Sequence, residues 1–197
     1  LGNSLTTAND LPSLTGKALD AEIIVHARGG ARLTEHLNRD TRLGSMTQHA
    51  LAQGNWNYVV MQESSNGPVT HRARFLETAT RLCAQIKEAG AKPVFFATWA
   101  YASTCPKLEK MVLSRADMHE HLFEAYNTAA CSNGALIAQV GRAFYDHPHS
   151  ESLYRTDGIH PSDKGTALAV RVIAECIRGA SADNSADVAG SPYTVYI

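Results

Sequence analysis

The sequence has little net charge, no basic run and no long apolar stretch. Its 18 lysines and arginines nearly balance 19 aspartates and glutamates, which leaves a net charge of −1 at pH 7. This balance provides no field that would steer nucleic acid or an acidic membrane surface to the protein. No apolar stretch approaches the roughly 20 residues that span a bilayer. We therefore expect neither nucleic acid nor a membrane as a partner.

Cysteine is also scarce, and its spacing fits no zinc template. The four cysteines are Cys83, Cys105, Cys131 and Cys176, and no two of them form a CxxC pair. Cys83 and Cys176 lie on apolar faces of predicted helices, which favours buried free thiols. Cys105 and Cys131 lie in or beside predicted loops, where a disulfide would form if the protein is exported. We expect no metal and no cofactor.

Two further kinds of segment are absent. No GxGxxG and no GxxxxGK[ST] follows a predicted strand, which argues against a nucleotide-binding module. The first ten residues have neither the charged region nor the apolar region of a signal peptide. The chemistry of the protein must therefore come from other motifs.

Short apolar runs alternate with amphipathic stretches along the chain. The runs predict strands at Ala21–His26, Tyr58–Met61, Pro93–Ala97 and Ala135–Val140, apolar on both faces as in a covered parallel sheet. The amphipathic stretches predict helices at Asp10–Leu19, Thr41–Gln53, Arg72–Ala89, Arg115–Ala130 and Asp163–Arg178. This alternation predicts an α/β fold with a mainly parallel, doubly wound sheet. The 197 residues suffice for one such domain.

The end of the chain departs from this alternation. Residues 181–191 resemble a linker of small and polar residues, which leaves the predicted domain at residues 1–180. Residues 192–197 end in a strand-like run, whereas the chain opens on Leu1 with no strand before it. We hypothesise that the last strand fills the first-strand position of the sheet, with Ile197 beside Leu1, through a circular permutation or a reordered chain. A strand added at a sheet edge is the alternative.

Two distant segments carry the residues that acyl transfer needs. Ser4 lies in GNSL, where a small residue permits a sharp turn and a following helix would aim amides at the serine. Asp157 and His160 lie in DGIHPS, just before the last predicted helix. The acid can fix the histidine tautomer and leave the other ring nitrogen to activate a serine. For Ser4 alone, a helix-capping role is the simpler interpretation.

The segments GNSL and DGIHPS resemble the first and last signature blocks of the SGNH (GDSL-type) hydrolases, in the order found in that superfamily and across nearly the whole chain. The resemblance implies a flavodoxin-like three-layer sandwich. It also implies a serine esterase that works through a catalytic triad and an acyl-enzyme. Ser4 would be the nucleophile, His160 the base and Asp157 its orienting acid, and the Ser4 amide would contribute to the oxyanion hole.

The two middle blocks match the family less closely. The second block is a glycine after the second strand, for which Gly30 is the first choice and Gly29 the second, with a simple turn as the alternative. The third block is normally Gly-x-Asn, but here QESSN follows YVVM, which resembles a carbohydrate-esterase-like branch with Gln-Glu at this place. Gln62 is the first choice for the side-chain oxyanion donor, and Asn66 is the alternative. Glu63 should point away from Gln62 and brace the loop.

Trp99 and Tyr101 follow the strand predicted at Pro93–Ala97, at the sheet edge that holds ligands in open α/β folds. With Gly29 they are candidate substrate-binding residues, although core packing explains the two rings equally well. By analogy with the family, the substrate is a small-molecule or carbohydrate ester, and an O-acetyl group on a carbohydrate is the first choice. A catalytically silent carbohydrate-binding relative is the alternative. Export to the periplasm or medium is slightly favoured over the cytoplasm, and the oligomeric state stays open.

Overall fold

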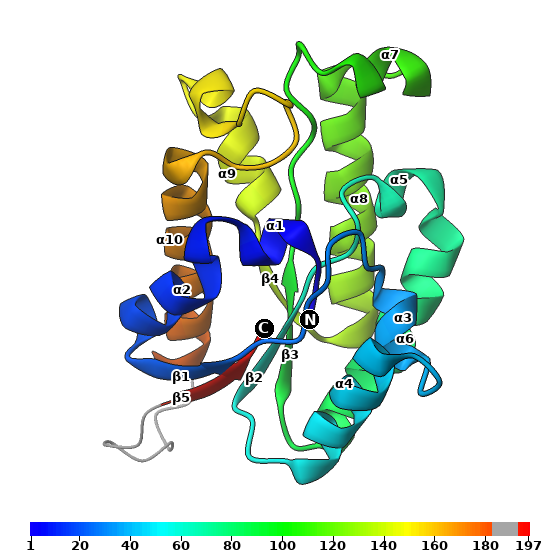
Figure 1. Cartoon of the computed structure of the whole chain (residues 1–197), viewed down its shortest axis with the longest axis vertical. Coiled ribbons are helices and arrows are strands. Elements are labelled where there is room, and N and C mark those ends of the chain that lie inside the picture. Colours follow the sequence, from blue (N-terminus) through cyan, green and yellow to red (C-terminus); the bar gives the residue numbers. More distant parts are fainter. Residues whose placement is uncertain (183–192) are drawn as a thin grey trace.

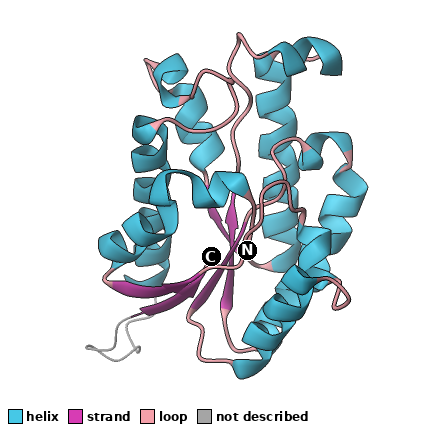
Figure 2. Cartoon of the chain, in the orientation of Figure 1, coloured by secondary structure: helices cyan, strands magenta, loops and turns pink. Residues whose placement is uncertain are grey.

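The chain forms three layers around a parallel sheet (Figures 1 and 2). The computed structural model describes residues 1–182 and 193–197. Its strands are β1 (Ala21–Ile24), β2 (Tyr58–Met61), β3 (Lys92–Phe96), β4 (Leu136–Ala138) and β5 (Tyr193–Tyr196), all parallel and in the order β1-β5-β2-β3-β4. Counted with β5 first, this is the 2-1-3-4-5 order of flavodoxin-like sheets. The predicted fold class is confirmed.

Helices cover both faces of the sheet (Figure 1). One face carries α2 (Leu11–Leu19), α9 (Val140–Asp146) and α10 (Asp163–Ala182), and the other carries α3 (Leu33–Leu37), α4 (Arg42–Gln53), α6 (Arg72–Glu88) and α8 (Arg115–Asn133). Five shorter helices of the described chain lie between these elements or at its start: α1 (Ser4–Thr7), η1 (Ala8–Asp10), α5 (Gly67–Thr70), α7 (Pro106–Met111) and η2 (Ser150–Leu153). The loops at one edge of the sheet therefore hold most of the irregular structure.

Alternate strand residues supply two separate cores, because successive side chains point to opposite faces of a sheet. The core under α6 and α8 takes Val59, Met61 and Phe95, and the core under α9 and α10 takes Tyr58, Val60 and Val94. Burying each such side chain stabilises the fold by roughly 1.5–3 kcal/mol. The two cores clamp the strands from both sides and give the loops a rigid base.

Both ends of the chain meet in the middle of the sheet. β5 lies between β1 and β2, where the Ile197 amide donates to the Ile24 carbonyl at 2.8 Å and its carbonyl accepts from His26 at 3.1 Å. Gly2 extends the pairing of β5 with the segment after β1, because its amide donates to the His26 carbonyl at 3.4 Å. Figure 1 shows the two ends beside each other. A permuted or reordered chain stays a hypothesis.

Element boundaries differ from the prediction at the last helix. α10 continues to Ala182, so the first two residues of the predicted linker 181–191 are helical. The final turn is held because the Ser181 hydroxyl donates to the Ile177 carbonyl at 2.9 Å and lies 2.8 Å from the Tyr58 hydroxyl. The rest of the predicted linker and residue 192 of the predicted final segment lie outside the described residues.

All four cysteines are free thiols. Cys83 is buried on α6, and burial raises the pKa of its thiol to about 12. Cys176 is half-buried on α10, and burial raises the pKa of its thiol as well. The disulfide considered between Cys105 and Cys131 is not formed: Cys105 is buried before α7, whereas Cys131 is exposed within α8, which extends past the predicted helix end to Asn133.

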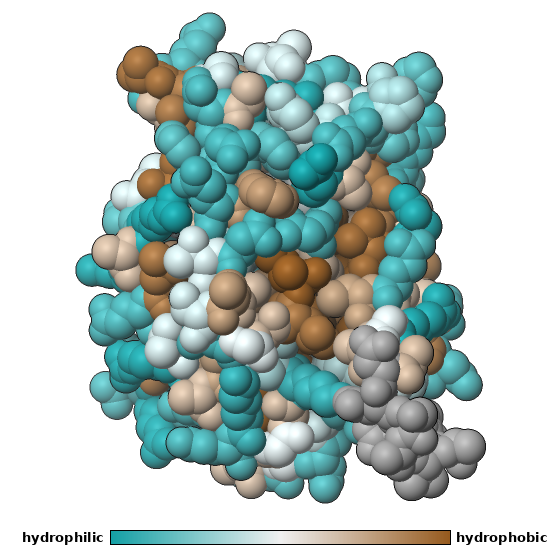
Figure 3. Space-filling model, turned by 180° about the vertical axis from the view of Figure 1, so that it is seen from behind, coloured by the Kyte–Doolittle hydropathy of each residue, from teal (hydrophilic) through white to brown (hydrophobic). Residues whose placement is uncertain are grey.

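The surface is mostly hydrophilic. Figure 3 shows the face opposite to that of Figure 1, with hydrophobic atoms near its middle and at the upper corner where α7 lies. Among the described residues, the exposed large hydrophobic side chains are Leu14, Met46 and Val112. No helix in the described part of the chain combines the length and the apolar character needed to cross a bilayer.

Candidate active site

Ser4 is the first residue of α1, and in space it lies just beyond the end of β5. We call the turn of residues 2–5 the serine turn. Asn3 caps this helix, since its side-chain oxygen accepts from the Leu5 amide at 3.1 Å. The side-chain nitrogen of Asn3 donates to the Ala31 carbonyl at 3.0 Å, in the loop after β1. Asn3 is buried and fixes the turn between two strands. Ser4 thus lies at the switch in strand order, where open α/β sheets bind ligands.

Residues 157–162, which we call the acid–base loop, bring His160 to Ser4 from the other end of the chain. Nε2 of His160 lies 3.0 Å from Ser4 Oγ, and Nδ1 lies 2.5 Å from Asp157 Oδ2. Both are hydrogen-bond distances, so Asp157 favours the tautomer with hydrogen on Nδ1 and Nε2 can accept from the hydroxyl. The side chain of His160 is 33% exposed and that of Asp157 is 45% exposed. The pair therefore faces solvent.

Asp157 is held ionised by its own loop. Its Oδ1 accepts from the amides of Ile159 and His160, both at 2.9 Å. Burial acts to raise the pKa of this carboxyl, but the hydrogen bonds from the His160 ring and the two amides outweigh it and lower the pKa below its ordinary value. A carboxylate in this state can stabilise an imidazolium.

The acid–base loop rests on the segment that follows β3. The Ala102 amide donates to the Gly158 carbonyl at 2.8 Å, and the Trp99 indole donates to the Ile159 carbonyl at 2.9 Å. Gly158 has φ +68°, and a Cβ there would lie 3.0 Å from Cys105 Cβ, so this position requires glycine. The DGIHPS signature thus includes one residue that shapes the loop and takes no part in chemistry.

For Trp99 and Tyr101 the structure favours core packing, the second of the two interpretations, over substrate binding. Both side chains are 1% exposed. Trp99 stacks on Phe144 with ring centroids 4.1 Å apart, and the Tyr101 hydroxyl lies 2.8 Å from the Ser65 hydroxyl. Both rings lie in the core, because the chain between β3 and α7 runs through the interior at residues 99 and 101. They support the site from below.

Gly29 and Gly30 lie in an exposed turn after β1, closed by the Ala31 amide, which donates to the Arg28 carbonyl at 2.9 Å. Gly30 has φ +72°, a conformation that favours glycine. The Asn3–Ala31 hydrogen bond ties this turn to the serine turn. Within the described residues, neither the Gly30 amide nor the Ser4 amide donates a hydrogen bond. Neither amide therefore has an acceptor among the described residues.

The side chain of Gln62 is occupied beneath the serine turn. Its oxygen accepts from the Asn3 amide at 3.2 Å and from the Thr6 hydroxyl at 2.9 Å. Its nitrogen donates to the Glu63 carbonyl, and the residue is 1% exposed. The Gln62 amide that the sequence assigned to the oxyanion hole is therefore engaged: its oxygen holds the serine turn, and its nitrogen contacts the Glu63 carbonyl.

Asn66 differs from Gln62 in having a free amide. It is half-buried at the N-cap of α5, where its side chain makes no capping hydrogen bond. Its backbone carbonyl accepts from Val69 and Thr70 at 3.1 and 2.9 Å, which fixes the loop. Within the described part of the chain, no hydrogen bond uses the Asn66 side chain. Asn66, the alternative candidate for the oxyanion donor, thus has a side-chain amide that no described residue occupies.

Glu63 holds the loop after β2, the role that we expected for a side chain pointing away from Gln62. Its carboxylate oxygens accept from the Ser64 amide at 2.6 Å and from the Leu33 amide at 3.2 Å. Burial raises the pKa of this carboxyl, although the same hydrogen bonds oppose the rise. Glu63 therefore connects the loop after β2 to the start of α3, behind the glycine turn.

His36 lies in the same buried region. It is 0% exposed on α3, and its Nδ1 lies 2.8 Å from the Thr47 hydroxyl. Burial lowers the pKa of this imidazole to about 3. His36 is therefore neutral at physiological pH, and its hydrogen bonds join α3 to Thr47 and Gln48 of α4.

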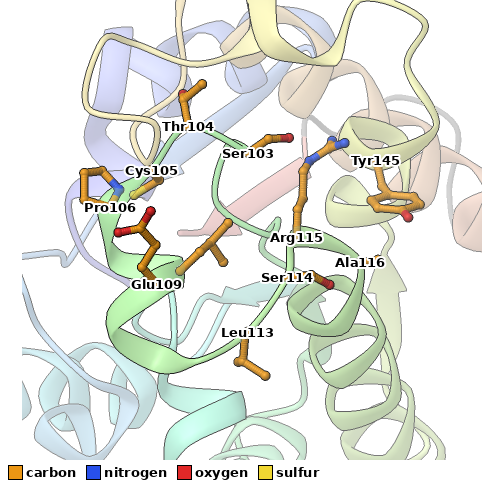
Figure 4. Close-up of a pocket in the computed structure, with 11 residues that line it drawn as sticks. Ser103, Thr104, Cys105, Pro106, Glu109, Leu113, Ser114, Arg115, Ala116 and Tyr145 are labelled. Carbon is orange, nitrogen blue, oxygen red and sulfur yellow. The ribbon is translucent and has the colours of Figure 1, made fainter.

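A cleft of about 600 Å³ lies beside the acid–base loop (Figure 4). One wall is the segment Ser103–Pro106, which follows the Ala102 contact with Gly158. The opposite wall is the first turn of α8 with Tyr145, and Figure 4 shows Arg115 extending between the two walls. No member of the Ser4–His160–Asp157 set lines this cleft. The cleft is therefore a surface beside these three residues, and polar side chains line it.

Two contributors to the site carried no assignment from the sequence. Asn3 sits within GNSL, and the preference of asparagine for helix N-caps was the signal that could have identified it. Thr6 gave no such signal, because its partner Gln62 is 56 positions away. Both act on the orientation of the turn.

The arrangement suits nucleophilic chemistry at a carbonyl. A hydroxyl, an imidazole and a carboxylate are linked in sequence, and the backbone amides of Ser4 and Gly30 donate to no other group in the described residues. Within residues 1–182 and 193–197, no group of at least three histidine, cysteine, aspartate or glutamate side chains is placed to hold a metal ion.

Similar structures support the assignment of the fold. A protein from Slackia heliotrinireducens classed as an SGNH hydrolase is 48% identical, over 89% of this chain and 95% of that chain, with a TM-score of 0.86. A DUF4886 family protein from Bacteroides uniformis is 20% identical over 97% and 85%, with a TM-score of 0.67. An acetylxylan esterase from Geobacillus stearothermophilus is 13% identical over 89% and 91%, with a TM-score of 0.65. The last two show a shared fold alone. No family model and no curated protein matches the chain.

Proposed function

The chain belongs to the SGNH hydrolase family, and from this premise we propose that it is a serine esterase with Ser4 as nucleophile, His160 as base and Asp157 as orienting acid. The observation that carries the proposal is the hydrogen-bonded series from the Ser4 hydroxyl through His160 to Asp157, at 3.0 and 2.5 Å. This order of groups is the one that activates serine for acyl transfer.

The proposed reaction has two steps. Ser4 Oγ attacks the ester carbonyl while His160 Nε2 takes the hydroxyl proton, and the resulting imidazolium is stabilised by Asp157. His160 then gives that proton to the leaving alcohol as the carbon–oxygen bond of the ester breaks. In the second step His160 takes a proton from water, the water oxygen attacks the acyl-enzyme, and the acid leaves as Ser4 recovers its proton.

The oxyanion of each tetrahedral intermediate needs fixed donors. The unused amides of Ser4 and Gly30 are two candidates. For the third we favour the Asn66 side chain over Gln62, because the Gln62 amide is already engaged with the Glu63 carbonyl. Each donor of this kind typically contributes about 3 kcal/mol to the transition state.

The substrate we propose is a small acyl ester, with an O-acetyl group on a carbohydrate as the first choice. The Gln62-Glu63 pair resembles the third block of a carbohydrate-esterase-like branch, and one structure of the same fold is an acetylxylan esterase. The cleft beside the acid–base loop, with Ser103, Thr104 and Tyr145 on its walls, offers polar groups for the alcohol portion. This choice rests on analogy and on the site's open, solvent-facing side.

A catalytically silent carbohydrate-binding protein is the second candidate. It would follow if the altered third block had removed the oxyanion donor. The intact Ser4–His160–Asp157 geometry and the free Asn66 amide favour the enzyme.

Hydrolysis of p-nitrophenyl acetate tests the proposal. We expect the wild type to turn over the ester, and Ser4→Ala and His160→Ala each to lower kcat/KM by roughly 10³-fold or more. Melting temperatures should stay near that of the wild type, because both side chains are only half-buried. Ser13→Ala and His121→Ala are matched controls, since both residues are exposed elsewhere on the surface. Full activity in the Ser4→Ala protein would overturn the assignment.

A further inference from the structure

The chain turns sharply between the serine turn and α2. Asn9 and Asp10 both have positive φ, +49° and +59°, in the left-handed region that residues with a side chain rarely adopt. Two such residues in succession persist only where surrounding contacts hold them. The Asp10 side chain makes no cap hydrogen bond to α2. The Asn9 side chain supplies the contacts instead.

Asn9 contacts the chain on both sides of the Asp157–His160 pair. Its Nδ2 donates at 3.0 Å to the carbonyl of Pro161, the residue that follows His160. Its Oδ1 accepts from the guanidinium of Arg155, two residues before Asp157. The Arg155 amide in turn donates to the His160 carbonyl at 2.8 Å, which closes the loop between these contacts.

The same side chain is anchored in α10. Nδ2 also donates to the Thr166 hydroxyl at 2.9 Å, and Thr166 is 0% exposed in the first turn of that helix. Within the described residues, every hydrogen bond that joins residues 1–20 to residues 150–166 includes Asn9, apart from the Ser4–His160 bond itself. Apart from the Ser4–His160 bond, Asn9 is therefore the polar link between the start of the chain and the segment that contains the acid–base loop.

Asparagine is the residue type that this position demands. Its amide donates and accepts at once, and it tolerates left-handed backbone better than most residues. Aspartate has the same shape but no donor, so it would place a charge against the Pro161 carbonyl. Glycine would relax the backbone and lose every contact.

We propose that Asn9 is a positioning residue that sets the distance between Ser4 Oγ and His160 Nε2. The inference rests on the proposed function for its kinetic consequence and on the contacts above for its geometry. A displacement of about 1 Å between reacting groups can lower a rate by roughly 100-fold. The substrate itself does not touch Asn9 in this account, so binding should change little.

Kinetics of Asn9→Asp and Asn9→Gly test the proposal. With p-nitrophenyl acetate, we expect kcat to fall roughly 10- to 100-fold in both variants, with KM within about threefold of the wild type. Asn9→Gly relaxes the strained backbone, so a loss of kcat there isolates the side chain. An unchanged kcat in both variants overturns the proposal, as does a loss that appears in KM alone.

Asn55 provides the matched control. It is an exposed asparagine with φ +68°, located between α4 and β2 at the far edge of the sheet. Asn55→Asp and Asn55→Gly make the same chemical changes at another asparagine with positive φ. They should leave kcat and KM within about twofold of the wild type, and an equal loss of kcat there would show that Asn9 acts only through general stability.

A structural measurement separates this inference from the proposed function. In a crystal structure of the Asn9→Asp protein, we expect the distance from Ser4 Oγ to His160 Nε2 to lengthen from 3.0 Å beyond hydrogen-bond range. A distance that stays at 3.0 Å would overturn the positioning role even if the wild type is an esterase. A lengthened distance in a protein with no esterase activity would support the positioning role and reject the function.

Discussion

The serine turn and the acid–base loop carry the two halves of one site, but they are held in opposite ways. The serine turn is buried, and its contacts come from other strands: Gln62 and Ala31 bond to Asn3 across 59 and 28 positions. The acid–base loop faces solvent, and Asp157 is held by amides two and three residues ahead. The serine turn is thus held by buried contacts with distant segments. In the acid–base loop the geometry of Asp157 and His160 is set locally, although the loop also docks on Ala102, Trp99 and Asn9.

This difference predicts how substitutions in each half should affect folding and activity. Changes around the serine turn should disturb both folding and activity, because the contacts there are buried and shared. Changes in the acid–base loop should affect activity with little effect on stability, because exposed pairs contribute little to folding.

The largest effect should come from Gly2→Ala in the serine turn. An added Cβ would lie 2.2 Å from the Thr6 hydroxyl oxygen and 2.9 Å from the Gln62 side-chain oxygen, so the turn must shift. We expect about 1–3 kcal/mol of destabilisation and roughly a 100-fold loss of kcat. Urea unfolding and p-nitrophenyl acetate hydrolysis measure both. An exposed control is Gly179→Ala, where an added Cβ meets nothing within 4 Å.

A pair of variants in the third block should split activity from stability. Asn66→Ala should lower kcat by about 100-fold, through the loss of about 3 kcal/mol of oxyanion stabilisation, with the melting temperature unchanged. Gln62→Ala should mainly lower the free energy of unfolding, because the buried Asn3 amide and Thr6 hydroxyl lose their acceptor. The reverse outcome, in which Gln62→Ala keeps its stability and loses only kcat, would return the donor role to Gln62.

Asp157→Asn should give a smaller loss in the exposed half. Asparagine keeps an acceptor but removes the charge that stabilises the imidazolium, and solvent replaces part of it because this side chain is 45% exposed. We expect kcat to fall roughly 10- to 100-fold, with unfolding in urea unchanged within about 0.5 kcal/mol. A strong destabilisation would show that the loop is not held locally.

The smallest effect at neutral pH should come from His36. Its folded pKa of about 3 lies below the ordinary value of 6.5, so between these values the unfolded chain binds a proton that the folded chain does not. The contribution of His36 to stability should therefore be constant above about pH 6.5 and fall toward pH 3, by at most about 1.4 kcal/mol per pH unit. Urea unfolding of His36→Gln across this range should show a flatter dependence than His49→Gln, an exposed control on α4. Equal slopes in the two variants would contradict this.

Local patterns explain how much of the site the sequence could predict. Asp157, Gly158 and His160 interact within one loop, so their spacing already carries their geometry. Ser4 could be chosen because GNSL also carries its own helix cap. The sheet was equally legible, since its strands are short apolar runs between amphipathic helices.

Contacts between distant segments explain what the sequence could not predict. Gln62 has the amide of an oxyanion donor, and only the fold shows that this amide faces the Glu63 carbonyl. Trp99 and Tyr101 follow a strand at the ligand edge, yet the chain turns inward there and buries them. Asn9 lies 152 positions from Pro161, so no local pattern reveals their contact.

Labelling with a fluorophosphonate, followed by mass-spectrometric mapping of the modified residue, tests the central claim most directly. The reagent reacts with a serine only where a base and an oxyanion hole activate it. We expect a single phosphonyl group on Ser4, with labelling lost in His160→Ala and retained in His121→Ala. Modification of a different serine, or an unlabelled Ser4 in the folded wild type, would contradict it.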